Sequence, residues 1–188
     1  MTDERIRTFR KLITLKDGAR VLFRVLGPPD EKALVALFQA VAADDLRYIR
    51  SDVRDQALVA GWAQDPDYDR VLPIVALVQD RIVGEATLHF KSGPHAHVAE
   101  LRIFLASDFR RRGLGLQMLE MMFELARWRD IHLLEAQIVA DQSRVIKAFK
   151  KLGFEQQGLL EDYFLTSELE PRDVAVLVKR LLAPQDEF

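Results

Sequence analysis

The sequence predicts a single α/β domain, and three observations support this prediction. Apolar and polar residues alternate from Lys11 to Val25 around an Asp-Gly pair, which is a strong signal for a β-hairpin. Val71–Val78 and Arg81–Phe90 have the period of strands and are separated by only two residues. A further strand over Val98–Leu105 is followed by a glycine loop and then by an apolar pattern of helical period. Strands therefore give way to alternating strands and helices along the chain.

The remaining elements follow from apolar periodicity and from turn residues. We expect helices over 31–41, 51–63, 114–125 and 143–152, a strand over 132–139, a strand after Gly153, and a last strand over 174–182. The polar interval 42–50 is typical of a loop or of the start of a helix.

Length and composition fit one compact unit. The chain has 188 residues, of which 49% are hydrophobic and 30% charged, and this is ordinary globular composition. We expect one domain over residues 1–183, with a frayed tail over 184–188.

Charge and cysteine content restrict the classes of function. The formal net charge is -2, so no overall positive field favours nucleic acid or an anionic membrane. The chain has no cysteine, which excludes disulfides, thiolate metal sites and a cysteine nucleophile. We find no signal peptide and no apolar run of membrane-spanning length. The expected location is the cytoplasm.

The segment Arg110–Gly115 reads Arg-Arg-Arg-Gly-Leu-Gly and lies where the strand over 98–105 passes into a helix. The first N–H groups of a helix lack internal acceptors, and the helix dipole makes that end positive. Gly113 and Gly115 let a phosphate approach the backbone, while the three arginines add charge. The pattern predicts an anion cradle suited to a pyrophosphate, although a tight turn with solvated arginines has the same spacing.

Two other glycine-loop classes do not fit this segment. A P-loop ends in Gly-Lys-Ser/Thr, whereas Leu116 follows Gly115 here. The dinucleotide fingerprint needs a third glycine where this chain has Met118, and we interpret the acidic Glu135 downstream as a coincidence.

Residues on both sides of the loop make the pattern more specific. The chain carries, in order, Ala99-Glu100-Leu101, Phe109–Gly115 and Val145–Phe154. This order and separation resemble the signature of the GNAT superfamily of N-acetyltransferases, whose coenzyme A motif is Q/R-x-x-G-x-G/A. The resemblance covers about Val71 to Leu182. Looser matches at 16–21, 47–50 and 65–70 are similar to the bacterial protein-lysine acetyltransferase branch.

The resemblance implies a GNAT fold, in which a central mixed, mostly antiparallel sheet of six to seven strands is flanked by about four helices. It implies acetyl-CoA as co-substrate and a primary amine as acceptor, either a protein lysine or a small-molecule amine, with no metal. The expected cofactor-binding residues are Arg110, Arg111, Arg112, Gly113, Leu114, Gly115 and Leu116 for the pyrophosphate, and Ile103, Phe104 and Leu105 for the pantetheine arm. Acceptor sites in this family come from the region placed here at 31–69.

Glu100 is the first candidate for the general base, because it occupies the position of the Ala-Glu pair in the protein-acetylating branch. A lysine-like amine has a pKa of about 10.4, and only its neutral form attacks a thioester, so a base helps. A structural role also fits, because Glu100 shares a strand face with Arg102 and could pair with it. Glu85 on the preceding strand is the second carboxylate candidate.

Two family positions are replaced in this chain. Phe149 stands where many members have a tyrosine that protonates the departing thiolate, and phenylalanine cannot donate that proton. Gln142 replaces the asparagine that precedes the helix. Tyr163 is a possible substitute donor, although a tyrosine at the edge of the core is the favoured interpretation.

Other residues favour structural roles. His95 and His97 form a His-x-His pair without an evident third metal ligand, and are expected to be loop histidines. Met118, Met121 and Met122 at helical spacing are expected in the core.

The main hypothesis is direct acetyl transfer within a ternary complex. A non-catalytic acyl-CoA-binding sensor is the alternative, and a nucleic-acid binder is disfavoured by the charge. A homodimer is possible through exposed strand edges.

Overall fold

The computed structural model describes residues 4–181 and contains eight strands and six α-helices within that range. The elements in chain order are α1 (Glu4–Arg7), β1 (Arg10–Thr14), β2 (Arg20–Val25), η1 (Pro28–Asp30), α2 (Glu31–Gln39), α3 (Ala43–Leu46), α4 (Gln56–Gln64), β3 (Val71–Val78), β4 (Arg81–Phe90), η2 (Gly93–His95), β5 (Val98–Leu105), η3 (Ser107–Phe109), α5 (Leu114–Trp128), β6 (Leu133–Val139), α6 (Ser143–Lys151), β7 (Glu155–Leu165) and β8 (Pro171–Arg180). No helix among these residues is long and apolar enough to cross a membrane.

The strands form a mixed sheet in the order β1-β2-β3-β4-β5-β6-β8-β7. The β5–β6 pair is parallel, whereas the pairs β1–β2, β2–β3, β3–β4, β6–β8 and β7–β8 are antiparallel. The predicted α/β class is therefore confirmed. The sheet has eight strands rather than the expected six to seven, because the N-terminal hairpin pairs with β3 and extends the sheet.

Predicted elements and observed elements agree closely where periodicity is strong. The strands predicted at 71–78, 81–90 and 98–105 have these bounds in the structure. The predicted helix over 51–63 begins later, at Gln56, because the Asp55 carboxylate caps it by accepting from the N–H groups of Ala57 and Leu58. The expected last strand ends at Arg180, and the expected tail lies outside the described residues.

The described chain divides into two compact units. The first contains the residues up to His89 together with Arg102–Leu125, and the second contains Phe90–Leu101 together with the residues from Ala126 onward. The expectation of one domain over 1–183 stays a prediction.

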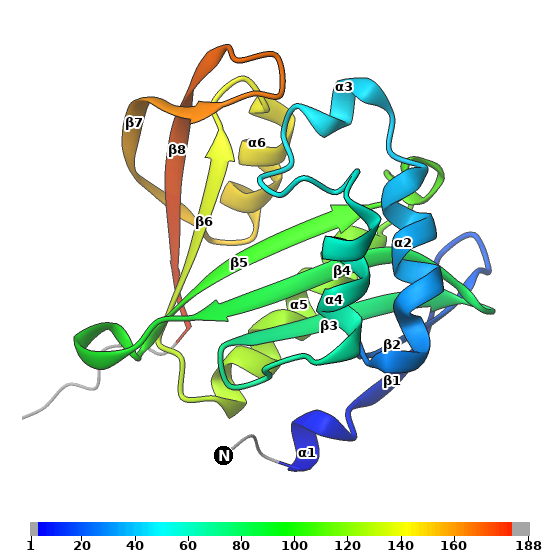
Figure 1. Ribbon diagram of the computed structural model, residues 1–188. Helices are drawn as coiled ribbons and strands as arrows, with labels where there is room; N and C mark the ends of the chain where they lie inside the picture. The colour runs from blue at the N-terminus through cyan, green and yellow to red at the C-terminus, as the bar shows by residue number, and fades with distance from the viewer. Residues whose placement is uncertain (1–3, 182–188) are drawn as a thin grey trace, which may run out of the picture. The chain divides into compact units, whose positions relative to one another are not determined.

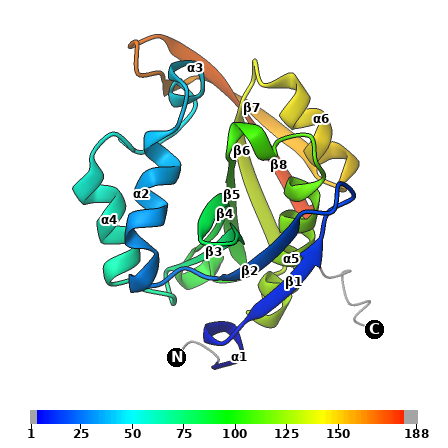
Figure 2. The same cartoon turned by 90° about the vertical axis from the view of Figure 1, so that its right-hand side faces the viewer.

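The first unit has three layers. Helices α2 and α4 lie on one face of β3 and β4, and α5 lies on the other (Figures 1 and 2). Phe38 of α2 anchors the first helical layer, because its ring packs edge-on against Trp62 of α4 at 5.8 Å and contacts Phe104 of β5 at 5.3 Å. The α5 layer buries an apolar stripe that includes Leu114, Met118, Met121, Met122 and Leu125, so the predicted core role of these methionines is confirmed.

Gly84 determines which side of β4 faces which helix layer. A Cβ atom added at Gly84 would lie 2.9 Å from both Leu105 Cδ2 and Met118 Sδ, so this position faces α5. Because side chains alternate along a strand, the neighbouring Glu85 faces the α2 and α4 layer.

A buried ion pair holds the hairpin against the start of α2. Asp30 is 3% exposed and accepts from both terminal nitrogens of Arg24 at 2.5 Å, and from the N–H of Gly27 at 3.0 Å. This paired geometry raises the pKa of the Arg24 guanidinium, mainly through the hydrogen bond to Asp30. The pair fixes the entry of the chain into α2.

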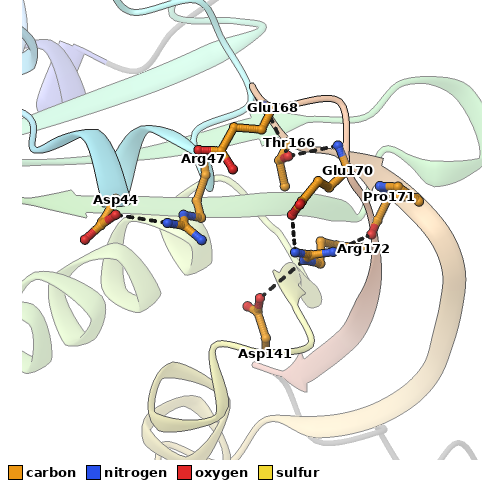
Figure 3. A network of polar contacts seen from close by, with 8 residues as sticks. All are labelled: Asp44, Arg47, Asp141, Thr166, Glu168, Glu170, Pro171 and Arg172. Carbon is orange, nitrogen blue, oxygen red and sulfur yellow. Dashed lines mark hydrogen bonds and ion pairs between the residues drawn. The ribbon is translucent and has the colours of Figure 1, made fainter.

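The second unit contains a polar turn between β7 and β8 (Figure 3). The buried Thr166 hydroxyl accepts from the N–H groups of Glu168 at 3.3 Å and Glu170 at 3.2 Å. Arg172 forms an ion pair with Glu170 and lies 3.7 Å from Asp141, just before α6. These contacts order the turn and the loop that leads into α6.

Removing the Asp30 carboxylate should destabilise the protein, because the half-buried Arg24 would lose its counterion. We expect Asp30→Ala to lower the free energy of unfolding by about 3 kcal/mol, measured by urea denaturation. Asp65→Ala, at an exposed position, is the matched control. Equal unfolding midpoints for the two variants would contradict the assigned role of the pair.

Candidate functional site

The predicted anion cradle forms the connection from β5 to α5 in the first unit. Arg111 and Gly113 both have left-handed backbone conformations, with φ of 59° and 88°. A Cβ at Gly113 would meet no atom within 4 Å, so the backbone is open on that side. The N–H groups of the first turn of α5 have no intrahelical acceptors. An open backbone at the positive end of a 15-residue helix fits a pyrophosphate.

Gly115 has a different role from Gly113. A Cβ at Gly115 would lie 3.1 Å from Leu105 Cδ1, a contact that is tighter than ordinary packing. Gly113 therefore supplies conformation and open space, while Gly115 allows the start of α5 to approach the end of β5.

Two of the three arginines are held by carboxylates from distant parts of the first unit. Arg110 forms a two-point ion pair with Asp45, at 3.0 and 2.8 Å, and its Nε donates to the Leu105 carbonyl at 3.1 Å. Arg112 Nε donates to Asp17 at 2.5 Å, which lowers the pKa of that carboxyl. The Arg112 guanidinium also stacks on Phe109, 4.1 Å from the ring centroid. These two side chains brace the loop.

Arg111 differs from its neighbours. It is exposed, and among residues 4–181 no hydrogen bond or ion pair engages its side chain. The expectation that all three arginines add charge therefore needs correction: Asp45 and Asp17 compensate two of them. Arg111 is the cradle arginine whose charge is not compensated by a carboxylate of the described chain.

A cavity of about 500 Å³ lies beside the end of β5, within the first unit. Its lining includes Ala36, Val41 and Asp45 from the α2–α3 region, Phe104 of β5, and Arg110 of the cradle. Its walls are mostly apolar, and the charged residues that line it are the Asp45–Arg110 pair, Asp80 and Arg81. The cavity therefore adjoins both the cradle and the strand segment Ile103–Leu105.

Glu100 lies on β5 within the second unit and is half-buried. It is the last residue of the parallel pairing, where its partner in register is Glu135 of β6. Glu135 is itself engaged, because it accepts from Lys91 Nζ at 2.6 Å and from Gln137 at 2.7 Å. These contacts give Glu135 a structural role, in agreement with the interpretation of its position as a coincidence.

Glu85 is the most perturbed carboxyl group of the described chain. Its side chain is 8% exposed in the middle of β4, and no hydrogen bond or ion pair reaches it from any residue between 4 and 181. Burial raises its pKa to about 7, from an ordinary value of 4.5. A carboxyl group that titrates near neutral pH is suited to proton transfer.

The structure shows where the residues at the two replaced family positions lie, and where the candidate substitute donor Tyr163 lies. Phe149 is buried, and its ring packs against Phe154 at 5.0 Å. Gln142 precedes α6 without capping it through its side chain. Tyr163 is 61% exposed on β7, so the expectation of a place at the edge of the core was wrong.

His95 and His97 lie in different environments. His95 belongs to the η2 turn, while the His97 ring packs against His132 at 6.0 Å. Within the described part of the chain, no group of three or more His, Cys, Asp or Glu residues could hold a metal ion.

Sequence reasoning did not identify Asp17 and Asp45 as partners of the cradle. They lie 95 and 65 residues from the arginines they bind, and no local pattern connects such positions. Glu85 was identified only as a second candidate, because its isolation depends on tertiary packing.

The fold is that of an α/β protein in which a glycine loop leads from a central strand into a long helix. A model of the acetyltransferase (GNAT) family matches residues 36–154, which is more than half of the chain. The chain belongs to this family, and the resemblance identified in the sequence is confirmed.

Individual relatives agree with this assignment. The L-amino acid N-acetyltransferase AaaT of Escherichia coli (strain K12) is 29% identical over 101 residues, which is 53% of this chain. The match spans 62% of that relative's length. The GNAT domain of S. lividans PAT superposes with a TM-score of 0.77 at 18% identity, covering 91% of this chain and 96% of that one. Mycobacterium smegmatis RimJ in complex with CoA-disulfide has a TM-score of 0.75 at 18% identity, covering 91% and 86%.

Glu85 should make stability depend on pH. Because its pKa is higher in the folded state, the folded protein binds an extra proton between pH 4.5 and 7, and stability falls as pH rises through this range. The loss amounts to about 3 kcal/mol, at about 1.4 kcal/mol per pH unit. We expect Glu85→Gln to remove this decline and to be more stable than the unmodified protein at pH 8, measured by urea denaturation at several pH values. Glu161→Gln, at an exposed strand position, should retain the decline.

Proposed function

We propose that this protein transfers an acetyl group from acetyl-CoA to a primary amine, either a protein lysine or a small-molecule amine. The observation that carries this proposal is the open backbone at Gly113, next to the uncompensated Arg111, at the start of α5. The similarity to an L-amino acid N-acetyltransferase of Escherichia coli and the CoA-disulfide bound to RimJ support it.

In this proposal, the backbone N–H groups of Arg111–Leu116 hold the pyrophosphate. The backbone of Ile103–Leu105, which lies beyond the residues of β5 that pair with β6, pairs with the pantetheine arm and brings the thioester to the same strand. Both segments lie in the first unit, where Leu105 packs against Gly115 and so links the strand to the cradle. Arg111 adds a charge-assisted contact to a phosphate.

Acetyl transfer then proceeds by direct attack of the amine on the thioester, since the chain has no cysteine to form an acyl-enzyme. Glu100 is the proposed general base that removes a proton from the attacking nitrogen. It precedes the pantetheine segment on the same strand by three residues.

A non-catalytic acyl-CoA sensor is the second candidate. The observation that favours it is Phe149, whose buried ring has no hydroxyl with which to protonate a thiolate. Acetyl-CoA binding without turnover of any amine would support the sensor.

The cradle is tested by calorimetric titration with acetyl-CoA and with desulfo-coenzyme A. We expect Gly113→Glu to abolish binding, because a carboxylate would occupy the open side of the loop and repel the phosphates. Arg111→Ala should weaken binding by about tenfold while leaving the backbone conformation accessible.

The matched control is Arg54→Ala, which removes an exposed arginine outside the cradle. If Arg111→Ala and Arg54→Ala bind acetyl-CoA equally well, the assignment of Arg111 to a phosphate is wrong. Absence of binding by the unmodified protein would overturn the proposed function.

The role of Glu100 is tested by steady-state kinetics of Glu100→Gln. Because the amide cannot accept a proton, we expect kcat to fall by about 100-fold or more, while acetyl-CoA affinity is retained. An unchanged kcat would remove Glu100 from the mechanism.

A further inference from the structure

We infer that Glu85 is a second proton acceptor, which takes the proton that the acceptor ammonium must lose before it attacks, and that Thr87 and His89 carry this proton to solvent. The inference rests on the proposed function and adds residues on β4 to it. It follows from four observations on the first unit.

The first observation is the position of Glu85. Gly84 faces α5, so Glu85 faces the opposite layer, where Phe38 contacts Phe104. The N–H of Ala106 donates to the carbonyl of Val83 at 3.0 Å, which pairs β4 with the end of β5. Counting two residues along each antiparallel strand places Glu85 opposite Phe104. Glu85 is thus one strand away from the segment proposed to bind the pantetheine arm.

The second observation is that Glu85 does not contribute to the stability of the folded protein, so stability does not account for a carboxyl group at this position. Ionising a buried carboxyl group that has no partner is costly. The residue opposite Glu85 on β3 is the buried, apolar Val75. Within residues 4–181 no donor compensates its charge by a hydrogen bond or ion pair. A buried carboxyl group of this kind is a candidate functional group. Glu85 does not itself line the cavity, and its link to the cavity is Phe104, which lies opposite it and does line the cavity.

The third observation is a polar row on β4. Glu85, Thr87 and His89 share one face, with about 7 Å between successive residues. Thr87 Oγ1 lies 3.0 Å from His89 Nε2. A hydroxyl both donates and accepts hydrogen bonds, and one water can bridge a carboxyl group to it. Burial decreases from Glu85 to the half-buried Thr87 and His89, so the row leads outward.

The fourth observation is the cavity. Phe104, opposite Glu85, lines the 500 Å³ cavity that also reaches Arg110 of the cradle. The charged groups expected on this face from β5 are Arg102 and Glu100, two and four residues from Phe104. The neighbouring aromatic positions of α2 and α4, Phe38 and Trp62, carry no charge.

The proton balance assigns separate roles to the two carboxylates. The ammonium first gives a proton to the Glu85 carboxylate and becomes a neutral amine. The amine forms a C–N bond to the thioester carbonyl, and the adduct nitrogen then loses a second proton to Glu100. The C–S bond breaks, and the Glu100 proton passes to the thiolate to give free coenzyme A. Glu85 returns its proton to solvent through Thr87 and His89, so one proton is released for each amide formed.

The test compares two acceptors that differ in amine pKa: Nα-acetyl-lysine amide, at about 10.4, and an alanine peptide with a free N-terminus, at about 8. The ratio kcat/KM is measured from pH 6.5 to 9.5 for the unmodified protein and for Glu85→Gln. At pH 7 we expect Glu85→Gln to lose about 100-fold with the lysine probe and only a few-fold with the peptide. The loss should shrink as pH rises, because more of the amine is then already neutral.

Three further variants make the result decisive. Glu85→Asp should recover part of the activity, Thr87→Val should lose about tenfold by breaking the row, and Glu161→Gln should match the unmodified protein. Acetyl-CoA titration and urea unfolding of each variant establish that it is folded and binds the co-substrate.

Two outcomes would overturn the inference while leaving the proposed function intact. One is an unmodified protein that acetylates a probe together with a Glu85→Gln variant of equal kcat/KM. The other is a loss of equal size for both probes at every pH, which a purely structural role would produce. Failure of the unmodified protein to acetylate either probe would contradict the proposed function, and the inference with it.

Discussion

The close packing of β4, β5 and α5 is the constraint on which the candidate site depends. Gly84 has no side chain, and Leu105 and Met118 occupy the space that a Cβ would need. Leu105 also packs against Gly115 in the first turn of α5. Two glycines on either side of one leucine therefore fix the end of β5 against the start of α5. The connection between them, which is the cradle, is held at both ends.

The arginines of the cradle are of two kinds. Arg110 and Arg112 are paired with carboxylates, whereas Arg111 has no such partner within residues 4–181. Arg110 and Arg112 are tied to Asp45 and Asp17, which come from the α3 helix and from the turn between β1 and β2. These pairs hold peripheral segments against the loop and leave little of their charge for a ligand. Between residues 4 and 181, no carboxylate compensates the helix N-terminus or Arg111, which are the groups proposed to contact the phosphates. Two of the three adjacent arginines thus have a structural role, and the third is not paired with a carboxylate within the described part of the chain.

The same glycine at position 84 also determines the environment of Glu85. Because Gly84 must face α5, its neighbour is turned toward the aromatic layer formed by Phe38, Trp62 and Phe104. Burial there raises the pKa of Glu85 to about 7, which lowers stability at neutral pH but provides a group able to exchange protons. The packing that positions the cradle therefore also buries Glu85 on the face of the sheet opposite α5 and so raises the pKa of its carboxyl group.

The sequence by itself determined the class of the fold and the bounds of three central strands, and it predicted the glycine loop that connects β5 to α5. Strands β3, β4 and β5 were predicted without error in their bounds because alternation, two-residue turns and glycine breaks are local signals. The family assignment also followed from short segments in a set order. The short helix α1 was not predicted, and the interval that contains α3 was left open between a loop and the start of a helix, since a single turn leaves too few residues for a periodic pattern.

Only the tertiary structure decided which charges are compensated and which carboxylate is isolated. The partners of Arg110 and Arg112 lie far away along the chain, and the burial of Glu85 depends on helices that pack over β4. Ion pairing and desolvation depend on distance in space, and sequence patterns report only neighbours along one strand or one helix.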